Sequence, residues 1–426
     1  MVHSPFTSAQ ASKGRAMIPK IVIIDSACIA AGYTAEAVKS LGFEPVFLCT
    51  LAQFQGDARR QIGSYRHIDC DTTSVAAVIE AIRTNGLAPL KGILTTEDTR
   101  LTVACAVARE LGVPGIDPAV LQLKDKAAVA ALIPEFSPRS VSFASDSIPG
   151  AAIRALFVDG GKVIVKPTQG AGALGVFCLS SSAEVETLAW KIGAAALPAY
   201  IDDGGWIAQS FIEGRLVSAE GYVIDGTVTV VGFTGRRKIG STESAAMYPV
   251  DESLPAPVSA KAKVAIAALI ERSNFRFGYF HIEFMVTATD CSIIDANMGR
   301  IGGGPVGQLL ALSSGKDPVD VYRHLIQVTL FGETLNGSPF YTTRDRRETY
   351  GVLYGLAGGG VISDVHLPEG MPCYHTQIFD SGAYVHPMGK DDWTWVGILT
   401  GFTRDTLRVI EEIRICTPEG QFPACF

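Results

Sequence analysis

The chain has 426 residues, with 36 basic against 43 acidic side chains and a formal charge of −7. This length allows about two to four domains with sizeable cores, and the acidic balance gives no basic surface for nucleic acid. Apolar residues make up 47% of the chain, yet no apolar run approaches the roughly 20 residues of a membrane span. Nine dispersed cysteines without a C-x-x-C pair favour reduced thiols in a cytoplasmic protein. Residues 1–17 lack an apolar core, which predicts a disordered leader rather than a signal peptide.

Strand and helix patterns alternate over residues 18–117. IVIID (21–25) predicts a buried strand, and TAEAVKSLGF (34–43) a helix that ends at Leu-Gly. GILTTED (92–98) predicts another strand, followed by a helix in 101–115. Such alternation is typical of a parallel sheet. The turn after IVIID lacks the dinucleotide glycine fingerprint, so we expect a Rossmann-like domain on the substrate side.

The next segment predicts one helix over 119–137, with Lys126 near its start, where a solvated charge run is the default interpretation. A small α/β subdomain is expected at about 138–210. Its strand 162–167 places Lys166 within an apolar run. A lysine there often only guards a sheet edge, but a glycine-rich loop follows this one at once.

That loop reads G-x-G-x-x-G at Gly170, Gly172 and Gly175. A dinucleotide site needs a helix after the glycines and an acid about 20 residues further on. A strand pattern follows instead, so the dinucleotide interpretation fails. A glycine loop between two strands fits a flap that covers phosphates with its backbone N–H groups.

The stretch 206–239 predicts a strand, a short hinge and an antiparallel meander. Glu220 lies in an otherwise apolar strand. Arg236, Arg237 and Lys238 form the one basic cluster. Beside a nucleotide–metal site, this cluster could bind a triphosphate or a substrate carboxylate.

Two further strand patterns joined by a turn carry the main candidate site. His281 and Glu283 share one face of the first strand, and Asp295 and Asn297 share one face of the second. A solvent-facing polar surface is the alternative. A register with Glu283 opposite Asp295 needs an odd loop, Thr287–Cys291. Two carboxylates and an amide oxygen suit Mg2+ that shares its shell with a substrate phosphate. The pattern predicts a metal–nucleotide site.

The order of these motifs resembles the ATP-grasp superfamily, and within it the carboxylate–amine ligases that join amino acids. The resemblance rests on Lys126 in a DK pair, Lys166 before the glycine loop, a QSFIEG hinge, and acids on a hairpin closed by N-x-x-R-x-G-G-G. It covers roughly residues 18–420. It implies an α/β and α+β multidomain protein with an ATP-grasp fold, a Rossmann-like N-terminal domain and a β-rich C-terminal subdomain. The expected divisions are a leader at 1–17, an N-terminal domain at 18–117, an ATP-grasp domain at 118–336 and a C-terminal subdomain at 337–426.

The resemblance also implies roles for individual residues. The ATP contacts would be Lys126, Lys166, Gly170, Ala171, Gly172, Gln209, Ser210, Phe211 and Ile212. The metal ligands would be Glu283, Asp295 and Asn297. The catalytic residues would be Arg300 and His281, and the substrate contacts Arg236, Arg237 and Gly303.

The sequence departs from the family pattern at three points. Relatives often carry a ribose-binding glutamate where this chain has Leu216, so Glu220 is a substitute candidate for ATP binding. Asp295 replaces a commoner, longer glutamate. An extra residue, Gly299, separates Arg300 from the asparagine.

The resemblance implies an ADP-forming ligase that activates a carboxylate as an acyl phosphate and couples it to an amine, forming an amide or peptide bond. ATP and Mg2+ would be required, with Mn2+ as a substitute. The expected partners are small carboxylate and amine substrates, without nucleic acid or membrane, and a homodimer is one option for assembly. Two alternatives remain: a carboxylase-like enzyme that activates bicarbonate, and a non-catalytic ATP-binding regulatory protein.

Overall fold

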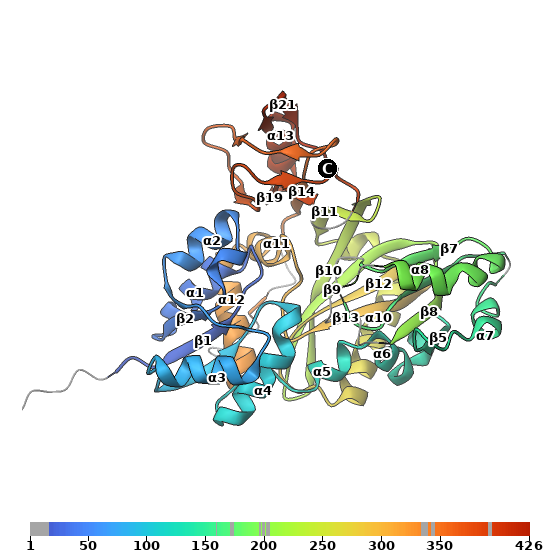
Figure 1. Cartoon of the computed structure of the whole chain (residues 1–426), viewed down its shortest axis with the longest axis horizontal. Coiled ribbons are helices and arrows are strands. Elements are labelled where there is room, and N and C mark those ends of the chain that lie inside the picture. Colours follow the sequence, from blue (N-terminus) through green and yellow to red (C-terminus); the bar gives the residue numbers. More distant parts are fainter. Residues whose placement is uncertain are drawn as a thin grey trace, which may run out of the picture.

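The computed structural model describes residues 17–158, 160–170, 174–195, 197, 201, 205–333, 340–341, 346–390 and 394–426. Figure 1 shows the N-terminal domain, the central sheet and the C-terminal strands as successive parts of the chain. The expected leader lies outside the described residues except for Met17. Across these ranges, no helix is long and apolar enough to cross a membrane.

The N-terminal domain is a parallel sheet with strand order β3-β2-β1-β4. Apolar runs form its central strands, and Ile21, Ile23 and Phe47 are fully buried. The expected Rossmann-like sheet is confirmed, with one further helix and one further strand, α2 and β3, that the sequence patterns did not indicate. The elements are β1 (Lys20–Ile24), α1 (Ala31–Ser40), β2 (Glu44–Leu48), α2 (Gly56–Gly63), β3 (Arg66–Ile68), α3 (Val75–Thr84), β4 (Leu90–Leu94) and α4 (Leu101–Leu111).

The prediction of a single helix over 119–137 was wrong. The chain forms α5 (Val120–Leu123) and α6 (Lys126–Leu132), separated by Asp125 in an extended conformation. The Asp125 carboxylate accepts from the backbone N–H groups of Ala127 (2.8 Å) and Ala128 (2.9 Å). An aspartate that caps a new helix in this way competes with continuation of the preceding one. The break makes Lys126 the first residue of α6.

The small subdomain, here called the lid, contains an antiparallel sheet with order β5-β8-β6-β7. It lies to one side of the central sheet (Figure 1) and has its own core, which includes Val163, Val165, Leu188 and Trp206. Its elements are β5 (Ser140–Phe143), α7 (Gly150–Arg154), β6 (Val163–Pro167), β7 (Phe177–Leu179), α8 (Leu188–Ala194) and β8 (Trp206–Ser210).

The central sheet has eight antiparallel strands in the order β13-β12-β9-β10-β11-β14-β19-β17. Helix α10 packs against one face, where Ile266 and Leu269 join Phe280 and Ile282 in the core. On the other face, α11 and α12 fill the space between this sheet and the N-terminal domain. The elements are β9 (Arg215–Ile224), β10 (Thr227–Ile239), β11 (Thr242–Tyr248), α10 (Ala256–Ser273), β12 (Gly278–Val286), β13 (Cys291–Met298), α11 (Val306–Ser313) and α12 (Pro318–Ile326), which continues as a π-helical turn (Gln327–Phe331).

The C-terminal part is β-rich, as expected, and its first strands extend the central sheet through β11. Two small sheets and one amphipathic helix complete it at the top of Figure 1. The elements are β14 (Thr349–Tyr354), β15 (Gly360–Val361), β16 (Asp364–His366), β17 (Tyr374–Gln377), β18 (Tyr384–Val385), β19 (Gly397–Phe402), α13 (Thr403–Glu412), β20 (Arg414–Thr417) and β21 (Gly420–Pro423).

Candidate active site

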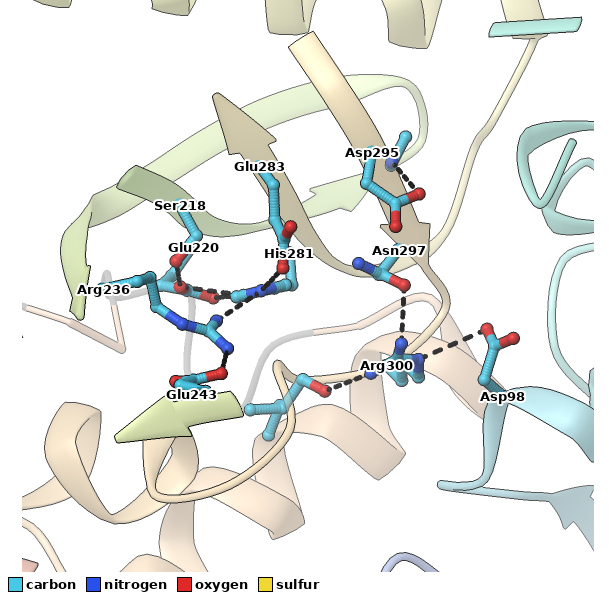
Figure 2. Close-up of polar contacts among 12 residues, drawn as sticks. Asp98, Ser218, Glu220, Arg236, Glu243, His281, Glu283, Asp295, Asn297 and Arg300 are labelled. Carbon is cyan, nitrogen blue, oxygen red and sulfur yellow. Dashed lines mark hydrogen bonds and ion pairs between the residues drawn. The ribbon is translucent and has the colours of Figure 1, made fainter. Parts of the chain in front are cut away.

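The hairpin β12–β13 has the register that the polar pattern predicted. Glu283 pairs with Asp295 and His281 pairs with Asn297, so all four side chains lie on one face of the hairpin (Figure 2). The expected odd loop was wrong, because Val286 pairs with Cys291 and leaves the four-residue loop 287–290. A β-bulge after Glu283 leaves one extra residue on β13 and restores the alternation.

The extra residue is Ile294, and its carbonyl oxygen accepts a hydrogen bond from Lys166 Nζ at 3.0 Å. Lys126 Nζ lies 3.3 Å from Asp295 Oδ1 and donates to the Gly170 carbonyl at 3.1 Å. Burial, and then the neighbouring charge of Lys126, lower the pKa of Lys166 to about 8. Two lysines from separate elements therefore meet at the strand that carries Asp295.

A buried polar cluster on β9–β12 surrounds His281 (Figure 2). His281 Nδ1–H faces both carboxylate oxygens of Glu220 at 2.9 Å, and Ser218 donates to Glu220 Oε1 at 2.7 Å. On the other ring edge, Arg236 Nη1 lies 2.8 Å from His281 Nε2. Arg236 also forms an ion pair with Glu243. This set of contacts fixes the orientation of the imidazole ring.

The protonation state of His281 is set by two opposing neighbours. Burial lowers the pKa of His281, whereas the Glu220 carboxylate raises it, and the balance is about 9. Arg236 favours the neutral ring, because a guanidinium only donates and therefore needs an unprotonated Nε2. Glu220 outweighs Arg236, so the ring is mostly protonated at neutral pH, and its Nε2 also faces Glu283.

Glu283 lies at the open side of this cluster, with Oε1 3.4 Å from His281 Nε2. Burial raises the pKa of Glu283, but His281 and Arg236 outweigh burial, so the pKa lies below its usual value. Glu283 is therefore ionised at neutral pH and available as an oxygen ligand.

Arg300 connects the hairpin to the N-terminal domain. Its Nη2 donates to Asn297 Oδ1 at 2.6 Å, and its Nε lies 3.5 Å from Asp98 Oδ1. The inserted Gly299 has a φ of 79°, and a Cβ there would come within 2.9 Å of Ile116. Only glycine adopts this conformation in this space without strain, so Gly299 permits the turn that precedes Arg300.

The donor set fits a hard cation bound in part through a phosphate. Within the described ranges, no group of three or more His, Cys, Asp or Glu side chains is clustered closely enough to hold a metal ion by itself. Two carboxylates (Glu283 and Asp295) and the amide oxygen of Asn297 supply few ligands, which is how Mg2+ is often bound. The metal roles of these three residues stay predictions.

The structure bears differently on the four hinge residues, 209–212, that were predicted to contact ATP. Gln209 is 5% exposed, and Phe211 is exposed. The Ser210 N–H donates to the Arg139 carbonyl, and its hydroxyl donates to the Leu156 carbonyl, both at 2.9 Å. These two groups of Ser210 are therefore not free to bind an adenine edge. Ile212 is half-buried, and its adenine role stays a prediction.

The predicted substrate contacts and ribose ligand lie in different surroundings. Arg236 is buried against Glu243 and His281, whereas Arg237 and Gly303 are exposed. Both oxygens of Glu220 face His281, which assigns this carboxylate to ring orientation rather than to a ribose.

Two predicted ATP contacts, Ala171 and Gly172, lie outside the described residues. Gly170 is described and has a φ of 126°.

Sequence reasoning missed two site neighbours, Glu97 and Asp98, whereas Lys238 belongs to the basic cluster that it named. Glu97 and Asp98 follow β4, and burial raises the pKa of Glu97 while Arg300 opposes this. Lys238 is exposed and adds positive potential at Lys166 and Glu283. The signal for the two acids was available, because ligands of parallel α/β sheets bind at the carboxyl ends of the strands.

Comparison with known proteins identifies the fold that carries these residues. Residues 160–307 match the family model described as the ATP-grasp domain. No curated protein matches the chain. The L-amino acid ligase from Bacillus licheniformis superposes with a TM-score of 0.75 at 16% identity, covering 94% of this chain and 99% of that one.

Two further solved structures have similar coverage. Phosphoribosylglycinamide synthetase from Anaerococcus prevotii has a TM-score of 0.69 at 15% identity and covers 94% of this chain and 100% of its own. The biotin carboxylase domain of 2-oxoglutarate carboxylase from Hydrogenobacter thermophilus has a TM-score of 0.71 at 14% identity, over 95% and 92% of the two chains. Identities this low show a shared fold rather than a shared reaction. The chain thus has the ATP-grasp fold, with an ATP-grasp domain in residues 160–307.

Proposed function

We propose that the protein is an ATP-dependent, ADP-forming ligase that couples a small carboxylic or amino acid to an amine. The observation that carries this proposal is the convergence of Lys126 and Lys166 on β13, beside the paired acids Glu283 and Asp295. Paired acids beside paired lysines suit a metal–triphosphate substrate, and an ATP-grasp domain provides the framework for one.

The reaction requires two balanced steps. A carboxylate oxygen attacks the γ-phosphorus of ATP, and ADP leaves, giving an acyl phosphate. The amine nitrogen then attacks the acyl carbon, the C–O bond to phosphate breaks, and the amine loses a proton. The first step brings two anions together, so Lys126 and Lys166 lower its barrier by neutralising charge.

Magnesium fits this scheme through residues of the hairpin. Glu283, Asp295 and Asn297 would hold Mg2+, or Mn2+ in its place, and the bound ion would neutralise the transferred phosphoryl group. One of the similar solved structures is described as a complex with MgADP. The position of Glu283 beside His281 and Arg236 keeps its carboxylate ionised for this role.

The part of the site beside the N-terminal domain, where we place the substrate, has both a positive and a negative side chain. Arg300 would stabilise the acyl phosphate, and the half-buried carboxylate of Glu97 would accept hydrogen bonds from an ammonium group. Glu97 adjoins Asp98, whose Oδ1 lies 3.5 Å from Arg300 Nε. A guanidinium and a carboxylate in the same part of the site match the zwitterionic end of an amino acid.

A bicarbonate-activating enzyme is the second candidate, because one similar structure is a biotin carboxylase domain described with bicarbonate bound. That structure is also described as a dimer, and a homodimer of this chain remains a prediction. A non-catalytic ATP-binding protein is the third, and the intact set of acids and lysines argues against it.

The deciding experiment is an ADP-release screen with Mg2+ over all pairs of the common amino acids, with mass detection of the product and a bicarbonate-only arm. ADP release that needs an amino acid, together with a dipeptide or amide product, is expected. Release with bicarbonate alone would support the carboxylase, and nucleotide binding without turnover on any pair would support a regulatory protein.

A further inference from the structure

We propose that Asp25 is a positioning residue, which acts through Arg100 to hold the Glu97–Asp98 turn in place for substrate binding. The substrate part of this inference rests on the proposed function. Asp25 directly follows β1, outside the hairpin and the lid, and none of the predicted ATP or metal contacts touches it in the described structure.

The backbone at Asp25 is held in an unusual conformation. Its φ is 51°, one of few positive values at non-glycine residues among the described positions. Aspartate tolerates this left-handed region better than most residues, but such conformations persist only where the surroundings enforce them. The residue is 6% exposed, so its carboxylate is directed into the protein rather than into solvent.

The carboxylate of Asp25 organises three loops at the carboxyl edge of the parallel sheet. Its Oδ2 accepts from Thr72 Oγ1 and from Arg100 Nε, both at 2.7 Å. Arg100 Nε also lies 2.9 Å from Thr72 Oγ1. The three groups form a closed triangle among the segments that follow β1, β3 and β4.

Arg100 is the last residue of the 3-10 turn Asp98–Arg100, directly after Glu97. The Arg100 N–H donates to the Glu97 carbonyl at 3.1 Å. The Glu97 side chain is held much more loosely than the backbone of the turn, since Thr99 Oγ1 approaches Glu97 Oε1 only at 3.5 Å. The turn is therefore fixed at its Arg100 end, while the Glu97 carboxylate is left available to a ligand.

Further contacts hold the loop after β4 against the loop after β1 and against Lys124. Thr96 Oγ1 accepts from the Ala27 N–H and contacts Ser26 Oγ, both at 3.0 Å. Lys124 Nζ donates to the Asp98 carbonyl at 2.9 Å. The turn is thus supported on both sides. Among the described residues, Asp25–Arg100 is the one ion pair that joins it to the loops of the parallel sheet.

The Asp25–Arg100 ion pair is only partly buried on the Arg100 side, and such a pair contributes little net stability compared with apolar packing of the same volume. Its use here is geometric, because it sets where Glu97 and Asp98 stand relative to Arg300. A displacement of about 1 Å at such a turn can cost two orders of magnitude in rate.

The test uses the full chain with Asp25→Asn, which keeps the tolerance for a positive φ and the acceptor for Thr72 but removes the charge opposite Arg100. Glu80→Gln, an exposed carboxylate on α3 of the same domain, is the matched control. Two quantities are measured: deuterium exchange of the peptide that contains residues 96–101, and the KM for the most active amino acid of the ADP-release screen.

We expect faster exchange in this peptide and a KM for the amino acid raised about tenfold or more, with an unchanged KM for ATP and a melting temperature close to that of the control. The KM effect should largely vanish when Asp25→Asn is combined with Glu97→Gln, because both act through one carboxylate.

Unchanged exchange at 96–101 would overturn the inference whatever the activity. Faster exchange with an unchanged KM for the amino acid, or an equal rise in the KM for ATP, would also overturn it. If the wild-type protein turns over no amino acid, the proposed function has failed, and the exchange data still decide whether Asp25 holds the turn.

Discussion

Lys166 Nζ donates to the Ile294 carbonyl at 3.0 Å, across the space between the lid and the central sheet. Ile294 is the residue that the bulge in β13 leaves without a partner on β12. One irregularity thus does two things: it places Asp295 opposite Glu283, and it frees a carbonyl that holds the lysine of the lid beside them.

Replacing Lys166 by Ala should weaken ATP binding, because a charge-assisted hydrogen bond to a phosphate is worth about 1.5–3 kcal/mol. That corresponds to roughly a 10- to 150-fold increase in the Kd for ATP, measured by calorimetry with Mg2+ present. Lys263→Ala on α10, an exposed lysine far along the chain from the lid, should leave the Kd unchanged. Equal affinities for the Lys166 variant and the wild type would remove Lys166 from the nucleotide site.

Nucleotide binding should depend on pH through Lys166. Its pKa in the free protein is lowered to about 8 by burial and by Lys126, and a bound triphosphate would raise this pKa by adding negative charge. Binding therefore favours the protonated lysine: affinity is constant well below pH 8 and falls by up to about tenfold per pH unit above it. Calorimetry in two buffers should show proton uptake at pH 9 and little at pH 6.5. Lys166→Ala should abolish the uptake; if the uptake persists in this variant, another group is responsible.

Replacing Glu283 by Gln should abolish ADP formation while leaving the fold intact. The substitution keeps the size of the side chain and removes its negative charge. In the wild type, His281 and Arg236 keep this carboxylate ionised. We expect kcat to fall by about 10²–10³-fold or more, as for other electrostatic groups that act in a transition state. Glu271→Gln, on the exposed side of α10, is the control. ADP release at the wild-type rate in the Glu283 variant would exclude a metal role for this residue.

The parts of the site that follow from local periodicity could be predicted from the sequence. Alternation with period two placed His281 and Glu283 on one face, and Asp295 and Asn297 on one face. The loop length could not be predicted in this way, because a bulge and an odd loop give the same alternation of faces. Only the paired strands distinguish them.

Contacts between domains could not be predicted from the sequence. Glu97 and Asp98 were assigned to the end of a strand, and their relation to Arg300 depends on how the parallel sheet docks against the hairpin. The burial of Arg236 was missed for a similar reason, since its partners Glu243 and His281 belong to neighbouring strands. A cluster of basic residues in a sequence does not reveal which member faces the core.

The break between α5 and α6 gives a prediction that separates stability from function. Asp125 caps α6 through the N–H groups of Ala127 and Ala128, and Lys126 follows directly and reaches Asp295. Asp125→Ala should cost about 0.5–2 kcal/mol in the free energy of unfolding and should also raise the KM for ATP, because the α5–α6 helix would tend to become continuous and move Lys126 away. Asp125→Asn retains a capping oxygen and should restore both quantities to near the wild-type values. Denaturant unfolding and ADP-release kinetics on the two variants measure these effects. A loss of stability in Asp125→Ala without any change in the KM for ATP would show that Lys126 does not depend on the cap for its position.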